Sequence, residues 1–240
     1  MIQTANKIEG LREHWQEVRA RIGTAALRSN RRPEEITLVA VSKTHPAEVV
    51  REAITAGVTD LGENRVQEAE SKIREVGRHA ARWHLIGHLQ SNKARRAVEL
   101  FDVIHSLDSV ALAQRLDRMC VELDRQELPV LIQVDLSHEA AKSGADEAEV
   151  AQIVVALKKC ERLRLTGLMT LPPFLDEAEQ VRPFFRKLRD LRDELGSQSA
   201  FGDGRGELSM GMTHDYEIAI EEGATIVRVG TAIFGKRVKL

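Results

Sequence analysis

Cysteine is scarce in this 240-residue chain, which contains only Cys120 and Cys160. Two cysteines without metal-ligand spacing exclude a disulfide framework and a cysteine-based metal site, and they indicate reduced thiols. Neither sign of charge predominates, because 35 basic residues stand against 37 acidic ones and the net charge is −2. A chain without a general positive field is not expected to bind nucleic acid or an anionic membrane.

Long apolar runs are absent as well. No segment approaches the ~20 apolar residues of a membrane span, and segment 1–9 lacks the apolar core of a signal peptide. These absences predict a cytoplasmic protein with no membrane partner. Hydrophobic residues still make up 42% of the chain, which is ordinary for a globular protein and sufficient for a large core.

The apolar pattern of the chain has two periods. Leu11, Trp15, Val18 and Ile22 are spaced three or four residues apart and predict an N-terminal helix within residues 1–30. Eight short β-branched or apolar segments follow, separated by segments of helical period. The predicted strands are 36–41, around 60–62, 82–86, 103–105, 130–134, 163–168, around 208, and 225–229; the predicted helices are 46–57, 64–77, 91–99, 109–125, 146–160, 177–195 and 214–222.

Strands that alternate with helices predict an α/β fold with a parallel sheet, here a single (β/α)8 TIM barrel. Segment 130–134 is almost continuously apolar, as expected for a strand covered on both faces. Eight units in 240 residues also agree with the ~250 residues of a typical barrel. The alternative is an open doubly wound sheet, but the glycine-rich first turn of that fold is missing from 42–46. The chain 1–240 is therefore predicted to be one domain, with the barrel over 36–235.

Polar residues follow the predicted strands at the end of the barrel where such folds carry their active sites. Lys43 comes two positions after the apolar run 38–41. A free lysine amine has a pKa of ~10.4, and only a desolvated or cation-flanked amine readily attacks a carbonyl or an aldehyde cofactor at neutral pH. The alternative is a surface lysine that follows a strand. Small and hydroxyl residues near the last two strands suit a phosphate group: Ser209, Gly211, Thr213, Gly230 and Thr231.

A second glycine-rich segment, 196–206, contains a G-x-G-x-G pattern. It lies between a predicted helix and the strand that follows, on the side of the barrel opposite the expected active site. A phosphate-binding loop is expected between a strand and the next helix. Segment 196–206 is therefore predicted to be a flexible connection.

Longer motifs support a pyridoxal-phosphate site. They are VAVSK at 39–43, GEN at 62–64, WHLIG at 83–87 with LQ at 89–90 and NK at 92–93, LSMGM at 208–212, and VRVGTAIFG at 227–235. With these motifs the chain resembles the pyridoxal-phosphate homeostasis protein family over nearly its whole length, and the fold of that family is similar to the barrel domain of alanine racemase.

The resemblance implies roles for the motif residues. Lys43 is implied to hold pyridoxal 5'-phosphate as a Schiff base, Asn64 to line the ring, and the 209–213 loop with Gly230 and Thr231 to hold the phosphate. Two mild departures are Thr213, where the family usually has serine, and the glycine-rich segment 197–206, which is longer than the family needs. Thr213 keeps the hydroxyl group.

The resemblance also places Arg228 at the pyridine nitrogen of the cofactor. A protonated ring would bring two positive charges to roughly 4 Å, which costs about 4 kcal/mol at an effective dielectric constant near 20 and lowers the ring pKa by about 3 units. The nitrogen is therefore expected to stay unprotonated, which weakens the ring as an electron sink and disfavours transamination. The alternative is an arginine paired with an acid at the barrel rim.

Racemisation would require a second acid or base near the cofactor. Alanine racemases are implied to take a tyrosine for this role from a separate domain and a partner subunit, whereas the only tyrosine here is Tyr216, in a predicted helix. Lys142, His84 and His88 stay open as second groups. The leading hypothesis is a monomeric, non-catalytic carrier that supplies pyridoxal phosphate to apo-enzymes. The alternatives are a single-domain amino-acid racemase and a cofactor-free barrel that acts on sugar phosphates.

Overall fold

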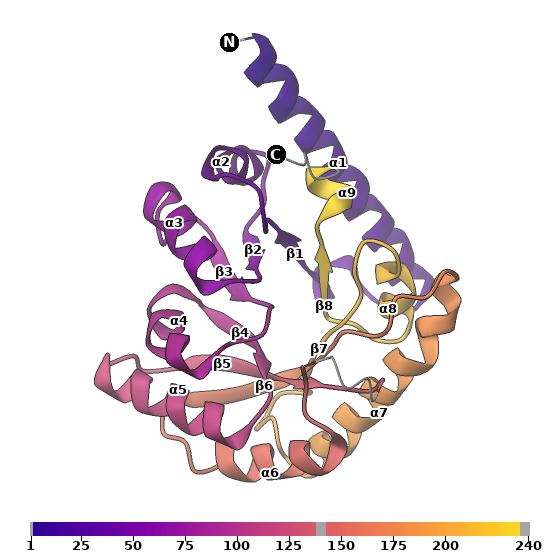
Figure 1. Ribbon diagram of the computed structural model, residues 1–240. Helices are drawn as coiled ribbons and strands as arrows, with labels where there is room; N and C mark the ends of the chain where they lie inside the picture. The colour runs from indigo at the N-terminus through magenta and orange to yellow at the C-terminus, as the bar shows by residue number, and fades with distance from the viewer. Residues whose placement is uncertain (1, 138–142, 236–240) are drawn as a thin grey trace.

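The computed structural model describes residues 2–137 and 143–235, and within them eight parallel strands close into a barrel (Figure 1). Each strand pairs with the next along the chain, and β8 pairs with β1. The strands are β1 (Thr37–Val41), β2 (Asp60–Glu63), β3 (Arg82–Leu85), β4 (Val103–Leu107), β5 (Leu128–Val134), β6 (Leu163–Thr170), β7 (Glu207–Ser209) and β8 (Ile226–Val229). The predicted (β/α)8 barrel is confirmed.

Helices surround the closed sheet, as Figure 1 shows. They are α1 (Ile2–Arg28), α2 (Ala47–Thr55), α3 (Val66–Val76), α4 (Ala94–Leu100), α5 (Val110–Glu122), α6 (Glu147–Leu157), α7 (Arg182–Ser197), α8 (Tyr216–Glu221) and α9 (Thr231–Phe234), with 3-10 turns at Pro33–Glu35, Ser91–Lys93 and Ala178–Val181. The α9 helix was not predicted, because four residues are too few to show a helical period.

The N-terminal helix α1 packs along α8 and α9 (Figure 1). Its buried stripe includes Trp15, Val18 and Ile22, the residues whose spacing predicted the helix. Since this stripe faces the C-terminal elements of the barrel, α1 covers the seam where β8 meets β1.

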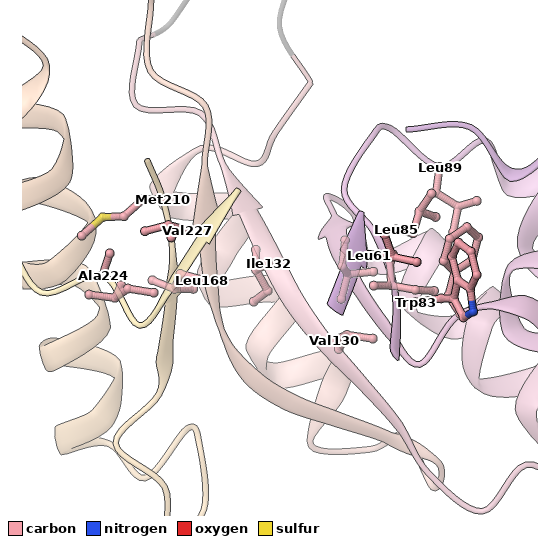
Figure 2. Close-up of a cluster of buried hydrophobic side chains, with 14 of the residues drawn as sticks. Leu61, Trp83, Leu85, Leu89, Val130, Ile132, Leu168, Met210, Ala224 and Val227 are labelled. Carbon is pink, nitrogen blue, oxygen red and sulfur yellow. The ribbon is translucent and has the colours of Figure 1, made fainter. Parts of the chain in front are cut away.

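Apolar side chains on the outer face of the strands pack against the surrounding helices. Figure 2 shows part of this outer core, including Leu61, Trp83, Ile132, Leu168 and Val227. These residues are buried, and they alternate along their strands with residues that point into the barrel. The outer core is thus formed by one of the two faces of the closed sheet.

The inner face of the sheet has a different composition. Only a small separate cluster of apolar residues lies there: Val39, Val103, Leu131, Met169 and Ile226, with Leu171 packed against it. Buried polar residues on neighbouring inner positions are His84, His105, Ser209 and Arg228. The strands β4 and β6 continue to Leu107 and Thr170, beyond their predicted ends, because their polar residues are buried and hydrogen-bonded: His105 bonds to Ser209 in the interior, and Thr170 Oγ1 donates to Val134 O of β5.

Neither thiol is placed for reactivity. Cys120 is buried and Cys160 half-buried, and burial raises the pKa of each to about 11. A thiol with so high a pKa has little thiolate at neutral pH. Among the described residues no helix is both long and apolar enough to cross a membrane.

Candidate functional site

Lys43 is the second residue after β1, at the C-terminal end of the barrel, and is half-buried. The chain turns sharply there, because the His45 N–H donates to Ser42 O at 3.1 Å. Thr44 has a φ of 67°, in the left-handed region that non-glycine residues rarely adopt, and its N–H donates to the Glu68 carboxylate. A strained residue held by tertiary contacts commonly marks a functional site.

A buried ion pair supports the other side of this turn. Lys72 Nζ lies 2.7 Å from Glu63 Oε1 and 2.7 Å from Ser42 O, and Ser42 Oγ donates to Glu63 Oε1 at 2.6 Å. Lys72 also contacts Glu68 at 2.7 Å, so one network fixes the residues on both sides of Lys43. Burial raises the pKa of Glu63 although Lys72 and Ser42 oppose this shift.

The network was not predicted from the sequence, although one feature of the sequence indicates it. Val66, Ala69 and Ile73 form the buried stripe of α3, and Lys72 lies on the same stripe. A lysine at a core position of a helix needs a buried acceptor or anion as a partner. Glu68, one turn before Lys72, and Glu63 in β2 provide two.

Asn64 follows β2 and is half-buried. The backbone of Gly87, after β3, lies so close to it that a Cβ on Gly87 would be 2.3 Å from Asn64 O, which explains why glycine occupies this position. A hollow of about 700 Å³ opens beside this contact. Its walls include Asn64, Glu68, His88, Gln90 and Lys93.

Glycines in the loops after β7 and β8 pack closely against neighbouring elements. Gly211 has a φ of 91°, and a Cβ there would lie 2.6 Å from Ala219 Cβ. A Cβ on Gly230 would lie 3.3 Å from Val41 O, so the β8 loop runs against the end of β1. Thr213 is half-buried and Thr231 is exposed.

Two contacts order these loops and join them to the Lys43 turn. Asp215 Oδ1 accepts the Met212 N–H at 2.6 Å and closes the β7 loop. The ring of His45 stacks on Phe234 of α9 with centroids 5.0 Å apart, so the turn after β1 contacts the element after β8. The structure therefore brings the Lys43 turn and the β8 loop together.

Arg228 points into the barrel from β8 and is 2% exposed. Its Nη1 donates to Ser209 Oγ at 2.5 Å, and its Nη2 donates to Thr170 O at 2.8 Å. Burial lowers the pKa of Arg228 to about 10, although the nearby Asp215 opposes the shift. Arg228 forms no ion pair with an acid in the described part of the chain, which differs from the alternative of an arginine paired at the rim. A buried cation held only by neutral acceptors can still donate to an electron-rich ligand.

Ser209 lies inside the barrel rather than in an open loop. Its hydroxyl is fully buried and contacts Arg228 and, at 2.9 Å, His105 Nδ1. The sequence suggested this hydroxyl as a phosphate ligand, whereas in the structure its hydrogen bonds go to the buried arginine and histidine.

The candidate second groups for racemisation are dispersed. His84 is buried in the barrel, and both of its ring nitrogens have partners, His105 and Asp60. His88 is exposed and contacts Asp108 at 3.1 Å. Tyr216 is buried under Arg21 of α1. Lys142, the third candidate beside His84 and His88, lies outside the described residues.

A larger groove of about 840 Å³ lies at the opposite end of the barrel, beside the N-terminal ends of β6 and β7 and the glycine-rich segment 202–206. It is lined by several arginines, three of which form ion pairs named here. The pairs are Arg164–Glu127 at 3.1 Å, Arg189–Glu222 at 2.9 Å and Arg192–Asp193 at 2.6 Å. Because catalytic and ligand-binding residues of this fold gather at the C-terminal ends of the strands, the candidate site is the Lys43 end.

Known proteins agree on the family of this chain. A family model described as alanine racemase, N-terminal domain, matches residues 12–238. The pyridoxal phosphate homeostasis protein of Escherichia coli (strain K12) is 46% identical over 225 residues, which cover 92% of this chain and 94% of the relative. This chain belongs to the pyridoxal phosphate homeostasis protein family.

Solved structures add to this assignment. PipY of Synechococcus elongatus PCC7942, a structure with PLP bound, is 44% identical, with a TM-score of 0.78 over 91% of this chain and 100% of PipY. Alanine racemase of Corynebacterium glutamicum is 19% identical, with a TM-score of 0.68 over 95% of this chain and 61% of the racemase, which is a likeness in fold alone. The predicted membership of the pyridoxal phosphate homeostasis protein family is confirmed.

Proposed function

We propose that this protein binds pyridoxal 5'-phosphate through a reversible Schiff base on Lys43, and that as a cytoplasmic monomer it buffers the cofactor and supplies it to apo-enzymes. The observation that carries the proposal is a lysine held in a strained, buttressed turn at the same end of the barrel as a buried arginine. The PLP-bound relative PipY and the name of the curated relatives support it.

The residues at this end of the barrel fit the groups of pyridoxal phosphate. The cofactor supplies an aldehyde that condenses with a primary amine, forming a C=N bond and releasing water. Lys43 provides the amine, and the remaining N–H groups of Arg228 provide donors for the ring nitrogen. The phosphate would be held by backbone and hydroxyl donors near β7 and β8: Gly211, Thr213, Gly230 and Thr231. Asn64 would line the ring.

The structure supports binding rather than catalysis in two ways. Arg228 keeps its proton at neutral pH, since its pKa is about 10, and a guanidinium can only donate hydrogen bonds. It therefore disfavours a protonated ring and leaves the cofactor a weak electron sink. Two residues considered as the second acid or base of a racemase are also poorly placed for that role, because both ring nitrogens of His84 are hydrogen-bonded inside the barrel and Tyr216 is buried against α1.

The first experiment titrates the purified protein with pyridoxal phosphate and follows the visible absorbance. Wild type is expected to take up the cofactor, whereas Lys43→Arg, which keeps the charge but cannot form the C=N bond, is expected to lose the visible band. Lys158→Ala is the matched control, because Lys158 lines the groove at the opposite end of the barrel. Equal cofactor uptake by wild type and Lys43→Arg would contradict the assignment.

Transfer tests the supply role. Loaded protein is mixed with an apo-enzyme that requires pyridoxal phosphate, and the rate of reactivation is compared with the rate of spontaneous release measured with a trapping amine. Reactivation faster than release is expected from a protein that delivers its cofactor, and reactivation at the release rate would contradict delivery.

The racemase alternative is tested by incubating the loaded protein with single amino-acid enantiomers in deuterated water, where no exchange of the α-proton is expected. Exchange that is lost in Lys43→Ala would favour a racemase.

A further inference from the structure

A continuous line of hydrogen bonds crosses the barrel interior from β8 to β2. Arg228 Nη1 lies 2.5 Å from Ser209 Oγ, which lies 2.9 Å from His105 Nδ1. His105 Nε2 lies 2.8 Å from His84 Nδ1, and His84 Nε2 lies 3.0 Å from Asp60 Oδ1. These five residues, one from each of β8, β7, β4, β3 and β2, are called the interior chain below.

The interior chain is shielded from water except at one end. Arg228, Ser209, His105 and His84 are each at most 2% exposed. The side chain of Asp60 is 16% exposed and stands at the first residue of β2. Because Lys43 follows the last residue of β1, a parallel neighbour, Asp60 lies at the opposite end of the barrel from the candidate cofactor site.

With both histidines neutral and Asp60 ionised, the five groups allow one direction of donation. A guanidinium has no acceptor, so Ser209 Oγ must accept from Arg228 and can give its own hydrogen to His105 Nδ1. His105 then donates from Nε2 to His84 Nδ1, and His84 donates from Nε2 to the Asp60 carboxylate. Every donor and acceptor in the line is matched, which requires both histidines to be neutral and to carry their proton on Nε2.

The charges around the interior chain agree with this direction. Burial lowers the pKa of His84, opposed by Asp60 and Asp102, and burial with the charges of Arg228 and Arg82 lowers the pKa of His105 further. Burial acts against ionisation of Asp60, but its hydrogen bonds with His84 and Thr59 leave its pKa lowered.

The reverse direction fails on these same charges. If His105 donated to Ser209, then either His84 would be doubly protonated or Asp60 would carry a proton. The first is disfavoured by burial and by the charge of Arg82, and the second by the hydrogen bond that Thr59 Oγ1 donates to Asp60 Oδ2 at 2.7 Å.

We propose that the interior chain is a positioning device which, given the proposed function, holds the Arg228 guanidinium toward the ring nitrogen of the cofactor from the far end of the barrel. Ser209 fixes Nη1, Thr170 O fixes Nη2, and the two histidines connect Ser209 to the ionised Asp60. Hydrogen bonds in such a line polarise one another, so a change at Asp60 is felt at Ser209. Asp60, His84 and His105 thus act through Arg228 and do not touch the cofactor.

The direct test is ¹⁵N NMR of the histidine rings in the cofactor-free protein, which does not depend on the proposed function. Both His84 and His105 are expected to show a protonated Nε2 and an unprotonated Nδ1 at pH 7. A protonated Nδ1 on either ring would overturn the direction of the chain. Ser106→Ala is the matched control, because Ser106 is a buried hydroxyl on β4 beside His105 that bonds to no other described residue.

The variant Asp60→Ala tests whether the line is coupled. Without an acceptor for its Nε2–H, His84 is expected to change tautomer, and the ring resonances of His105 should shift even though His105 does not contact residue 60. Unchanged His105 resonances would overturn the coupling. Asp60→Asn keeps an acceptor oxygen and is expected to retain the wild-type tautomers, which also separates a lost acceptor from a misfolded protein.

The affinity of variants for pyridoxal phosphate tests whether the interior chain affects cofactor binding. Ser209→Ala leaves a donor of a buried cation without its acceptor and is expected to weaken pyridoxal phosphate binding about tenfold. Asp60→Ala is expected to weaken it by a smaller factor, and Ser106→Ala not at all. Wild-type affinity in Ser209→Ala with altered histidine tautomers would overturn the link to Arg228. Failure of wild type itself to bind the cofactor would instead contradict the proposed function and leave the NMR result standing.

Discussion

Two buried regions of this barrel differ in composition although the same eight strands line both. The outer core between strands and helices is apolar, with residues such as Leu61, Trp83 and Leu168. The barrel interior has a small apolar cluster beside a hydrogen-bonded line that ends in Arg228 and Asp60. Successive residues of one strand therefore lie in different regions, since Trp83 faces the helices and His84 faces the interior.

The two regions are expected to contribute differently to the stability of the fold. Apolar burial stabilises the fold by roughly 25 cal/mol per Å², so the outer core is a large source of stability. Burying a cation such as Arg228 removes it from water, and hydrogen bonds do little more than offset that penalty. The polar interior is thus expected to contribute binding geometry rather than stability, and substitutions in the two regions should separate these properties.

The largest loss of stability is expected from truncation in the outer core. Trp83→Ala should lower the free energy of unfolding by about 3–5 kcal/mol, because it removes a fully buried side chain and leaves a cavity. Urea unfolding measures this loss, and Trp83→Phe is the matched control, with a smaller expected effect. Pyridoxal phosphate affinity of the folded fraction should stay at the wild-type level, and a parallel loss of affinity would break the separation between the two regions.

A somewhat smaller effect is expected at the ion pair that buttresses the Lys43 turn. Lys72→Met should lower the free energy of unfolding by about 3 kcal/mol, since it leaves Glu63 buried without its cation. The double variant Glu63→Gln with Lys72→Met should recover part of that loss. Urea unfolding of Lys72→Met, Glu63→Gln and the double variant gives the coupling free energy, and simple additivity would show that the pair does not act as a unit. Cofactor affinity should fall in both Lys72 variants, because Ser42 O loses its donor.

The smallest expected effect is a pH dependence of stability that arises in the interior. The folded-state pKa of His84 and of His105 lies below the unfolded value of ~6.5, so below that pH the unfolded chain binds protons that the folded chain does not. Stability should therefore decrease as pH falls below ~6.5, by at most about 1.4 kcal/mol per pH unit for each histidine.

Two carboxyl groups oppose that trend. The raised pKa values of Glu63 and Asp215 contribute stability that is present below their unfolded pKa values and is lost as pH rises through the folded ones. The difference between wild type and His105→Gln isolates one histidine. Between pH 5.5 and 6.5, the free energy of unfolding should decrease less with falling pH in the variant than in wild type. Between pH 7.5 and 8.5, the free energies of the two proteins should change in parallel. An identical slope in both proteins would mean that His105 is not held neutral.

Much of the fold could be predicted because each barrel strand and most helices have their own apolar period. The apolar run before Lys43 and the stripe of α1 are local patterns that need no tertiary information. The helix α9 was missed because it is one turn long, and the strand ends at Leu107 and Thr170 were missed because polar residues interrupt the apolar runs.

The site was predicted less completely, for a physical reason. Lys43 and Arg228 could be found from their motifs, but the contacts of Lys72 and Ser209 join residues that are far apart in the sequence. The alternation of side chains along a strand did allow one prediction: because Trp83 and Leu85 lie on the outer face, His84 must point inward. The partners of His84 lie on the neighbouring strands β2 and β4, and which side chains meet there depends on the register between the strands, which periodicity does not specify.

The most direct test of the central claim is reduction of the cofactor-loaded protein with borohydride, followed by peptide mapping by mass spectrometry. Reduction converts the C=N bond to a stable secondary amine, so the modified lysine can be located. The expected result is a single pyridoxyl modification on Lys43. No modification, or modification only at another lysine such as Lys93 or Lys142, would contradict the assignment of the site.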